Sequence, residues 1–557
     1  MTIKWETYNW PGGQPLAEAY RLRTDPAVLE LFGAHPLDAE GWTQRLERLR
    51  SHADKRADIR KVAEALRAYN ARFDAPEAVA NNIDALAEGA PAIVGGQQAG
   101  LWTGQLLVIH KAVTVIQAAR AAAGRLGRPV VPVFWIAGED HDWDEANHAY
   151  VPGGDLEPRK IAIPRPAGAR TSVSRTIVDA GAWDRALAEL SDTLPDSEFK
   201  LELLERLGYA SRRSATLSEL FADVLTWLFG REGLVLLDAD DPALRRLEAP
   251  MFRRLIEQGD SLAAAYASAA ERVKLAGYGI QADVVRDSAN LFLFRTDEPE
   301  RGGHEASAGE RTLLFRRNGR FEDRRGFPVA GFDELLRMAD ERPELFSNNV
   351  LTRPLMQDYV LPVLAAVLGP AEIAYWALTG EAFALLDMAM PIIVPRQSYT
   401  LVEGAIAKHI GKYGFTFDEI VNRFEAKKAE WLARHDELDI EGRFAEARRR
   451  FAEIYGPVLQ LASAVDPGLT QLGETNRRKI MEQIDYMEAR TIDARNRRFE
   501  TVVRRLDRMA RAIVPLGKPQ ERVINMTAYW NRYGRDWLDA LLRLPFEPCA
   551  SHRIVYL

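Results

Sequence analysis

The stretch from residue 91 to residue 136 constrains the fold more than any other part of the sequence. An apolar strand, PAIVGG, runs into a glycine-rich turn and then into a long apolar helix from Thr103 to Ala123, and RPVVPVFWIAG reads as a second strand. Continuous apolar strands joined through a helix are typical of a parallel βαβ unit whose sheet is covered on both faces. The stretch therefore predicts an α/β protein with a parallel-sheet core of the nucleotide-binding type.

The rest of the chain is organised around this core, which we expect to occupy residues 91–400. Residues 1–90 read as helices that pack on it. Two segments, at about 151–210 and 288–345, do not follow the alternation of strands and helices and are interpreted as insertions. The second contains a charged, glycine-rich loop, which is equally consistent with a solvated excursion and with a functional lid. The strand PIIVP closes the core near residue 395.

A long helical arm follows the core. Its apolar residues recur at alternating three- and four-residue steps, which is the spacing of a coiled-coil seam. We expect residues 401–515 to form an antiparallel helical hairpin that turns near SAVDPGLTQLGET and joins two copies into a homodimer, and residues 516–557 to return to the core. The two apolar runs are Phe451, Ile454, Val458, Leu461 and Val465, and Phe499, Val502, Leu506, Met509 and Ile513.

Charge and cysteine content exclude several classes of function. The chain has 73 Lys and Arg against 80 Asp and Glu, a net charge of −7, so no basic field draws it to nucleic acid or to a membrane. Its start lacks the features of a signal peptide, and no apolar run approaches the length of a membrane span, which favours a cytoplasmic protein. The single cysteine, Cys549, excludes an internal disulfide and a multi-thiolate metal site.

The glycine-rich turn is the first candidate site. A strand that enters a glycine turn before a helix places free backbone N–H groups and the positive end of the helix dipole at one point, an arrangement that binds phosphate. The turn matches neither a Walker loop nor a strict G-x-G-x-x-G motif, so a tight turn without a ligand is the alternative. The candidate nucleotide-binding residues are Gly95, Gly96, Gln97, Gln98, Gly100, Thr103, Gly104 and Gln105.

The same turn resembles the signature of class I aminoacyl-tRNA synthetases and related nucleotidyl transferases, in which a glycine precedes Leu-His-Ile-Gly-His in a Rossmann-like domain. Gly100 keeps the glycine, while Trp102 and Gln105 stand where the two histidines would be. The Lys-Met-Ser-Lys-Ser loop of those enzymes is absent, and PRQS at residues 395–398 is the nearest substitute. The resemblance therefore implies a synthetase-like core with an incomplete set of motifs.

A cluster of ionisable residues follows the second strand, in WIAGEDHDWDEANHAY. Charges crowded at the carboxyl end of a strand shift one another's pKa values, which favours a functional site over a polar loop that caps the next element. Carboxylates with histidines serve as acid and base or hold Mg²⁺, the candidate metal, whereas no helical histidine spacing indicates a zinc site. The candidate catalytic residues are Glu139, Asp140, His141 and Asp142.

A third cluster places polar side chains among apolar ones, in FSNNVLTRPLMQDYVLP and GPAEIAYWA. An arginine here could grip a carboxylate through two hydrogen bonds, and the amides could read hydroxyl groups. The alternative is that the polar residues cap helices and that the aromatic residues belong to the core. The candidate substrate-binding residues are Asn348, Asn349, Arg353, Gln357, Asp358, Tyr375 and Trp376.

Taken together, four long motifs resemble the bacillithiol biosynthesis cysteine-adding enzymes, the BshC family, essentially from end to end. The motifs are GQQAGLWTGQLLVIHK, PVFWIAGEDHDWDEANH, FSNNVLTRPLMQDYVLP with GPAEIAYWA, and QERVINMTAYWNRYG. The resemblance implies a Rossmann-like catalytic core with two connecting insertions and a coiled-coil arm that dimerises. It also implies a ligase that joins L-cysteine to the amine of glucosaminyl malate, so that the functional thiol belongs to the substrate.

An amide bond between a carboxylate and an amine requires an activated acyl group, and the synthetase-like frame suggests a cysteinyl adenylate formed from ATP. In this hypothesis the glycine-rich turn cradles phosphate, Glu139 to Asp142 bind metal or take the proton of the attacking amine, and Arg353 holds a substrate carboxylate. Two alternatives remain at this point. One is a metal-dependent hydrolase that uses the Glu139 to His148 loop, and the other is a non-catalytic coiled-coil scaffold.

Overall fold

The computed structural model describes residues 4–295, 309–317, 319–435 and 439–557. The chain forms two compact units. The first runs to Thr400 and takes in Gln520–Val555, and the second comprises Leu401–Pro519 with the last two residues.

A five-stranded parallel sheet forms the centre of the first unit. Its order is β13 (Ile392–Pro395), β12 (Val363–Leu368), β2 (Ala92–Gln97), β3 (Val131–Ile136) and β6 (Val235–Asp238). Nearly every residue in these strands is buried, which explains why they read as continuous apolar runs. The sheet confirms the predicted α/β, Rossmann-like core.

Helix α6 (Leu106–Leu126) connects β2 to β3 and packs on both strands and on β12. The sequence predicts that this helix starts at Thr103, but residues Leu101–Thr103 form a separate 3-10 turn, η2. By length and composition α6 could cross a membrane, which differs from the expectation of no such run, but 78% of its apolar window is buried inside the protein. It is therefore a core helix of the sheet.

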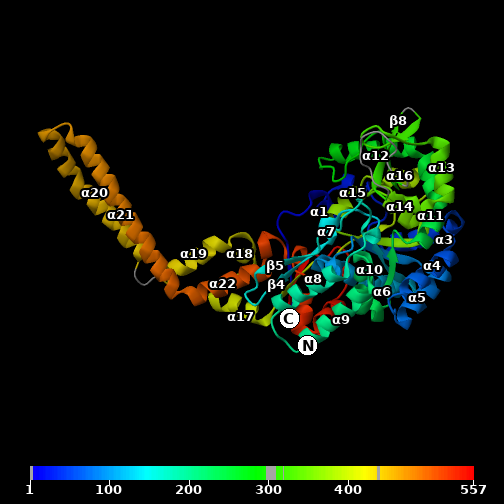
Figure 1. Cartoon of the computed structure of the whole chain (residues 1–557), viewed down its shortest axis with the longest axis horizontal. Coiled ribbons are helices and arrows are strands. Elements are labelled where there is room, and N and C mark those ends of the chain that lie inside the picture. The colour runs from blue at the N-terminus through cyan, green and yellow to red at the C-terminus, as the bar shows by residue number, and fades with distance from the viewer. Residues whose placement is uncertain (1–3, 296–308, 318, 436–438) are drawn as a thin grey trace. The chain divides into compact units, whose positions relative to one another are not determined.

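The segment before the sheet is helical, and three of its helices, α3, α4 and α5, pack on the central strands. Figure 1 shows α4 and α5 next to each other, in agreement with their contacts. The elements before β2 are β1 (Lys4–Tyr8), α1 (Pro15–Leu22), α2 (Pro26–Leu29), α3 (Ala39–Ser51), η1 (Ala53–Lys55), α4 (Ile59–Ala71) and α5 (Glu77–Ala87).

A second, antiparallel sheet lies within the same unit, with the order β10-β9-β8-β7-β11. It is built largely from the segment that we interpret as the second insertion, and the charged loop predicted there, at residues 296–308, lies outside the described residues. The strands are β7 (Ser288–Phe294), β8 (Arg311–Arg317), β9 (Arg320–Glu322), β10 (Pro328–Gly331) and β11 (Phe346–Asn348).

Between β3 and β6 the chain forms a short hairpin and then helices, and other helices connect the two sheets. The hairpin strands β4 and β5 pair antiparallel. The elements are α7 (Trp143–Ala146), β4 (His148–Pro152), β5 (Pro158–Ala162), η3 (Val173–Arg175), α8 (Ala180–Thr193), α9 (Lys200–Arg213), α10 (Leu217–Phe229), η4 (Gly230–Glu232), α11 (Pro242–Glu257), α12 (Gly259–Leu275), α13 (Phe332–Glu341), η5 (Pro343–Leu345), α14 (Arg353–Val360), α15 (Pro370–Trp376) and α16 (Gly380–Leu385).

The C-terminal part of the first unit covers the start of α6. The backbone N–H of Leu106 donates to the carbonyl oxygen of Ile524 across 2.9 Å, and Gln105 forms an isolated bridge with Asn525. Residues that are more than 400 positions apart in the chain therefore meet at the βα turn. This part contains η7 (Gln520–Arg522), α23 (Thr527–Tyr533) and α24 (Asp536–Arg543), and strand β15 (His552–Tyr556) follows.

The second unit is a helical arm, which confirms the predicted coiled-coil region. Helices α20 (Ile440–Val465) and α21 (Leu469–Arg498) run side by side as an antiparallel hairpin (Figure 1) and turn within the predicted SAVDPGLTQLGET segment. The arm helix α22 buries Leu506, Met509 and Ile513. The other elements near or in the arm are β14 (Tyr399–Val402), α17 (Gly404–Tyr413), α18 (Phe417–Asn422), α19 (Phe424–Arg434), α22 (Glu500–Ile513) and η6 (Pro515–Gly517).

Candidate active site

A pocket of about 930 Å³ opens at the carboxyl ends of β2, β3 and β12, where open α/β sheets bind ligands. The antiparallel sheet supplies its other wall through β7, β8 and β11. The structure thus brings parts of all three predicted clusters to one place. The predicted residues that line the pocket are Gly96, Gln97, Gln98, Glu139, Asp140, His141, Asn348, Asn349, Arg353 and Tyr375.

Other predicted residues lie outside this lining. Asp142 is the N-cap of the short helix α7, where its Oδ1 accepts from the backbone N–H of Glu145, as the capping alternative anticipated. Asp358 is fully buried and accepts from Arg45 and Arg56 across 2.5 and 3.0 Å, so it anchors the N-terminal helices. The remaining predicted residues outside the lining are Gly95, Gly100, Thr103, Gly104, Gln105, Gln357 and Trp376.

Packing explains the two glycines at the end of β2. A Cβ added to Gly95 would lie 2.6 Å from Val115 Cγ2 and 3.2 Å from Lys111 Cγ, both on α6. A Cβ added to Gly96 would lie 2.7 Å from the carbonyl oxygen of Trp135 on β3. The distances of 2.6 and 2.7 Å are too short for a real Cβ, so these glycines let α6 and β3 approach the strand.

The turn at residues 100–104 is closed by the C-terminal segment. Asn525 Nδ2 donates to the carbonyl oxygens of Trp102 and Gly104, and the first N–H of α6 is occupied by Ile524. Gly104 has φ of +65°, which favours glycine. The observed turn therefore differs from the predicted open phosphate cradle, because the N–H groups of Thr103, Gly104 and Leu106 already donate to protein carbonyl oxygens.

Asp140 and His141 are held by an arginine from the opposite wall. Arg311 Nη1 lies 2.9 Å from Asp140 Oδ1 and 3.0 Å from His141 Nδ1, and the guanidinium stacks 3.7 Å from the Phe292 ring centroid. Burial raises the pKa of Asp140, but hydrogen bonds from His141 and the Arg311 charge outweigh this and lower it to about 2. Asp140 is thus a carboxylate across the physiological pH range, with His141 beside it.

Glu139 lies deeper and is fixed by a buried ion network. Its Oε2 accepts from Arg245 across 2.6 Å and from the backbone N–H of Asn348 across 2.9 Å. Arg245 also donates to Glu248, whose pKa is raised to about 7, mainly by burial, against the lowering effect of the Arg245 charge. Glu139 therefore joins the acidic loop after β3 to strand β11, and so positions the two walls of the pocket.

A lysine on α6 connects the floor of the pocket to its third wall. Lys111 is almost fully buried, and its Nζ donates to the Gly96 carbonyl oxygen across 2.6 Å, to Gln97 Oε1 across 2.9 Å and to Glu372. Arg353 lies 3.5 Å from the other Glu372 oxygen and donates to the Tyr375 hydroxyl. Burial lowers the pKa of Lys111, while Glu372 opposes this and keeps the ammonium paired.

Two buried amides on the lining have unused hydrogen-bonding groups. Asn348 is 2% exposed, and within the described structure neither its Nδ2 nor its Oδ1 has a partner. Gln98 Nε2 also lacks a partner there, while Gln98 Oε1 accepts from the N–H of Ala99. Buried polar groups are nearly always paired, so a polar ligand or an ordered water in the pocket would complete the hydrogen bonds of these amides.

Comparison with known proteins identifies the family. The family model for the BshC N-terminal Rossmann-like domain of bacillithiol biosynthesis matches residues 3–397, and that for the BshC C-terminal coiled-coil domain matches residues 399–557. The chain belongs to the BshC family.

Curated members of the BshC family cover almost the whole chain. The protein named "Putative cysteine ligase BshC" from Bacillus cytotoxicus is 34% identical over 96% of this chain and 97% of its own length. Its namesake from Geobacillus kaustophilus is 36% identical over 98% of each chain, and that from Symbiobacterium thermophilum is 38% identical over 90% of each chain. Both the core and the arm of this chain are thus shared with these BshC proteins.

In this BshC chain, sequence reasoning missed several pocket residues. Arg311 comes from a strand in the second insertion, and its sequence context, ERTLLFRR, gave no motif. Lys111 reads as an ordinary residue of an apolar helix, although a lysine inside such a helix is itself a signal of a buried partner. Glu372 is the third residue of α15 and accepts from the N–H of Gly369, so it also completes a helix cap.

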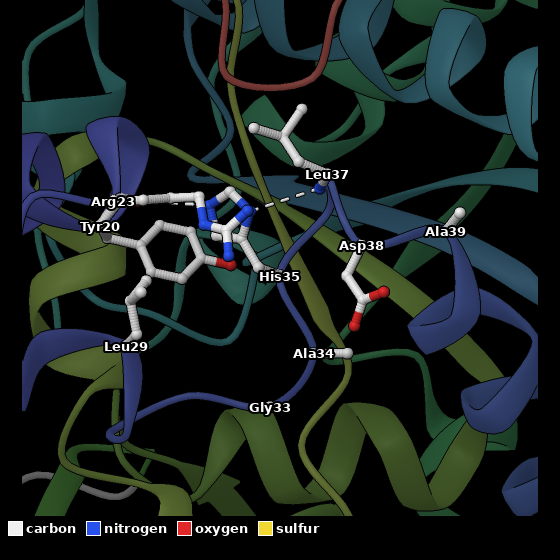
Figure 2. Close-up of a pocket in the computed structure, with 9 residues that line it drawn as sticks. All are labelled: Tyr20, Arg23, Leu29, Gly33, Ala34, His35, Leu37, Asp38 and Ala39. Atoms are coloured by element: carbon white, nitrogen blue, oxygen red, sulfur yellow. Dashed lines mark hydrogen bonds between the residues drawn. The ribbon is translucent and has the colours of Figure 1, made fainter. Parts of the chain in front are cut away.

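A second cavity, of about 480 Å³, is lined by Tyr20, Arg23, His35 and Asp38 among others (Figure 2). His35 Nε2 lies 3.2 Å from the carbonyl oxygen of Tyr20, and His35 Nδ1 accepts from the N–H of Leu37 across 3.3 Å, the bond drawn as a dashed line in Figure 2. Burial lowers the pKa of His35 and favours the neutral ring. Because both ring nitrogens contact backbone groups, this cavity offers less chemistry to a BshC enzyme than the larger pocket.

The side chains of the pocket do not form an evident binding site for the candidate Mg²⁺. In the described parts of the chain, no group of three or more His, Cys, Asp and Glu side chains is arranged to hold a metal ion. The carboxylates nearest to His141 are instead committed to arginines.

Proposed function

We propose that the chain is a ligase that joins L-cysteine to the amine of glucosaminyl malate, the last step of bacillithiol biosynthesis. The observation that carries this proposal is the pocket at the carboxyl ends of β2, β3 and β12, which Asp140, His141 and Arg311 line together with the unpaired Asn348 amide. The membership of the BshC family and the curated name "cysteine ligase" among its relatives support the choice of substrates.

The pocket has groups of both charges, as two charged substrates require. Glucosaminyl malate carries carboxylates and an amine, and cysteine carries one of each. Arg353 projects into the pocket from α14 and can bind a carboxylate through its guanidinium, while the Asn348 amide can both donate to and accept from a hydroxyl or amide group. The carboxylates that follow β3, Glu139 and Asp140, give this side of the pocket a negative charge that can attract a protonated amine.

ATP is the proposed source of activation, because a ligase must convert the cysteine carboxylate into a better acyl donor. The phosphate cradle expected at the βα turn does not support it, since the first N–H of α6 already donates to the carbonyl oxygen of Ile524. The support lies in the pocket, where Arg324 is a further arginine that could hold phosphate oxygens. When bound, ATP would supply the leaving group for the cysteine carboxyl carbon.

We further propose that the arm makes the protein a homodimer. Ile454 is 71% exposed and Val465 is 76% exposed on α20, and Val458 and Leu461 between them are also exposed. These residues share one side of the helix at coiled-coil spacing, and a second copy would bury them.

Mass spectrometry of the purified protein tests the ligase proposal. The protein is incubated with cysteine, glucosaminyl malate and each nucleoside triphosphate in turn, with serine in place of cysteine as the control for the thiol substrate. We expect the mass of bacillithiol only with cysteine and a nucleotide. Product without a nucleotide would end the proposal of ATP activation, and absence of product under every condition would end the proposal of a ligase.

A further inference from the structure

Another cavity, of about 610 Å³, lies at the amino ends of the central strands, opposite to the active-site pocket. Its lining includes Pro91 and Pro362, the residues directly before β2 and β12, and Arg128, in the loop before β3. Strands β2 and β12 have six residues each, so about 20 Å of strand separates this cavity from the active-site pocket. A ligand bound here therefore does not touch the groups that line that pocket.

Apolar side chains form much of the wall of this cavity. Leu46 and Leu49 on α3 and Val360 at the end of α14 are 7%, 4% and 1% exposed. A space of several hundred Å³ with a largely apolar wall and a few polar groups is typical of a small-molecule site. The apolar residues of the wall include Leu46, Leu49, Ala57, Ile59, Pro91 and Val360.

Arg128 brings a guanidinium group with unused donors to the wall. In the described structure its Nη2 donates to the carbonyl oxygen of Gly89 across 3.3 Å, while its Nε and Nη1, both shielded from solvent, have no partner. Arg56 Nε also lacks a partner there, although Arg56 Nη2 donates to Asp358 Oδ2 across 3.0 Å. Buried polar groups are nearly always paired, and oxyanions are the strongest acceptors for a guanidinium group. Because one long hydrogen bond holds Arg128, a rotation of its side chain is enough to present these donors to a ligand.

Three carboxylates also line the cavity, and all three residues, Asp54, Asp58 and Glu88, are exposed. Asp58 Oδ1 accepts from the N–H of Arg60, so it caps the start of α4. Arg56 and Arg128 are only partly exposed. Water therefore screens the carboxylates more strongly than the two guanidinium groups, and the inner part of the cavity favours an anion.

We propose that this cavity is a further ligand site, which binds a small molecule with one oxyanion and an apolar body. The oxyanion, a carboxylate or a phosphate, accepts hydrogen bonds from Arg128, and the apolar body lies against Leu46, Leu49 and Val360. This site does not depend on the proposed ligase function, because it shares no lining residue with the active-site pocket.

Calorimetric titration of the wild type with three probes tests the class of ligand. The probes are hexanoate, hexyl phosphate and, as the neutral counterpart of hexanoate, hexanamide. We expect at least one of the two ions to bind with a Kd of about 1 mM, as suits a ligand of this size, and hexanamide to bind about tenfold more weakly. The ion that binds more tightly identifies the oxyanion. The proposal is wrong if neither ion binds, or if neither binds more tightly than hexanamide.

Three variants locate the bound ion. We expect Arg128→Gln to bind the tighter ion about tenfold more weakly than the wild type. Arg60→Gln, on the first turn of α4 and outside the lining, and Arg353→Gln, in the active-site pocket, should bind it as the wild type does. Unchanged affinity of Arg128→Gln would overturn the proposal. A loss of equal size in Arg60→Gln or Arg353→Gln would do the same, because the ion would then respond to net charge or occupy the other pocket.

A fourth variant, Ile59→Glu, keeps the test independent of the fold of Arg128→Gln. It places a carboxylate on the wall of the cavity at the first residue of α4, a position at which glutamate suits the helix dipole. The ion should bind this variant at least about tenfold more weakly than the wild type, because like charges repel. The thermal midpoints of Ile59→Glu and Arg128→Gln check that both variants fold, and wild-type affinity of a folded Ile59→Glu for the ion would contradict the site.

Discussion

Lys111 Nζ donates to the carbonyl oxygen of Gly96 across 2.6 Å, from a helix that begins nine residues after the end of β2. The bond holds the end of the strand in place, and the same ammonium donates to the Glu372 carboxylate on α15. One buried cation therefore sets the spacing between two walls of the pocket. The glycine at position 95 is what allows the lysine stem to pass.

Replacement of this lysine should disturb both stability and activity. Lys111→Met leaves Arg353, 3.5 Å away, as the cation paired with the Glu372 carboxylate among the described residues, and we expect the free energy of unfolding to fall by about 3–5 kcal/mol. The double variant Lys111→Met with Glu372→Gln should recover part of that loss, because the carboxylate that has lost its lysine is then replaced by a neutral amide. Urea unfolding of the three proteins measures the effect, and equal loss in the single and double variants would contradict it.

Asp140→Asn and His141→Ala should abolish cysteine addition, with little change in the thermal midpoint of His141→Ala and a moderate fall for Asp140→Asn, whose carboxylate pairs with the buried Arg311. Both side chains lie on the pocket lining and are partly exposed, so their removal costs few packing contacts. Asp142→Asn is the matched control, because asparagine caps a helix as well as aspartate does. Product formation measures the activity of each variant, and differential scanning fluorimetry measures its thermal midpoint. A large drop in the melting temperature of Asp140→Asn, with unchanged activity per folded molecule, would show a purely structural role.

Stability should depend on pH through Glu521. This buried carboxylate accepts from Arg396 across 2.7 and 2.6 Å and pairs with His110, and although burial raises its pKa, the Arg396 charge and these bonds hold it well below the usual value. Its stabilisation is complete above the unfolded-state pKa of about 4.3 and is lost as pH falls toward the folded-state value. The melting temperature of Glu521→Gln should therefore be well below that of the wild type at pH 7. The difference between the two melting temperatures should become smaller below about pH 4.

Asn525→Ala should destabilise the βα turn from the other end of the chain. It removes the donor to the buried carbonyl oxygens of Trp102 and Gly104, and we expect a loss of about 2–3 kcal/mol. Gly104→Val should also unfold more easily, because valine disfavours a φ of +65°. Calorimetric titration with ATP separates this from the phosphate-cradle hypothesis, under which Gly104→Val would remain stable and lose only nucleotide binding.

The double variant Val458→Glu and Leu461→Glu should convert the proposed dimer to a monomer. Both side chains are exposed on α20 in the single chain, so the change should leave the thermal midpoint of the monomer nearly unchanged. Light scattering across a range of protein concentrations gives the mass. A wild type that stays monomeric at every concentration would contradict the dimer.

Sequence patterns predicted the parts of the structure that depend on local order. The buried strands β2 and β3 were readable as apolar runs. The clusters around Asp140 and Asn348 meet because Asp140 follows β3 and Asn348 ends β11, and both strand ends line the same pocket. Arg311 could not be placed, since its partner Asp140 is 171 residues away and no periodicity links the two. The covered turn was likewise hidden, because Gly104 and Asn525 are 421 residues apart.

The contact of Asn525 with the turn after β2 also sets an order of events during synthesis. The sheet, α6 and the pocket residues all precede residue 401, but the segment that closes the turn is made only after residues 401–519. At roughly 5–20 residues per second, the ribosome takes on the order of ten seconds to translate that interval. During this time the nascent core has an open seam at the start of α6, so its folding is completed only when the last segment of the chain arrives.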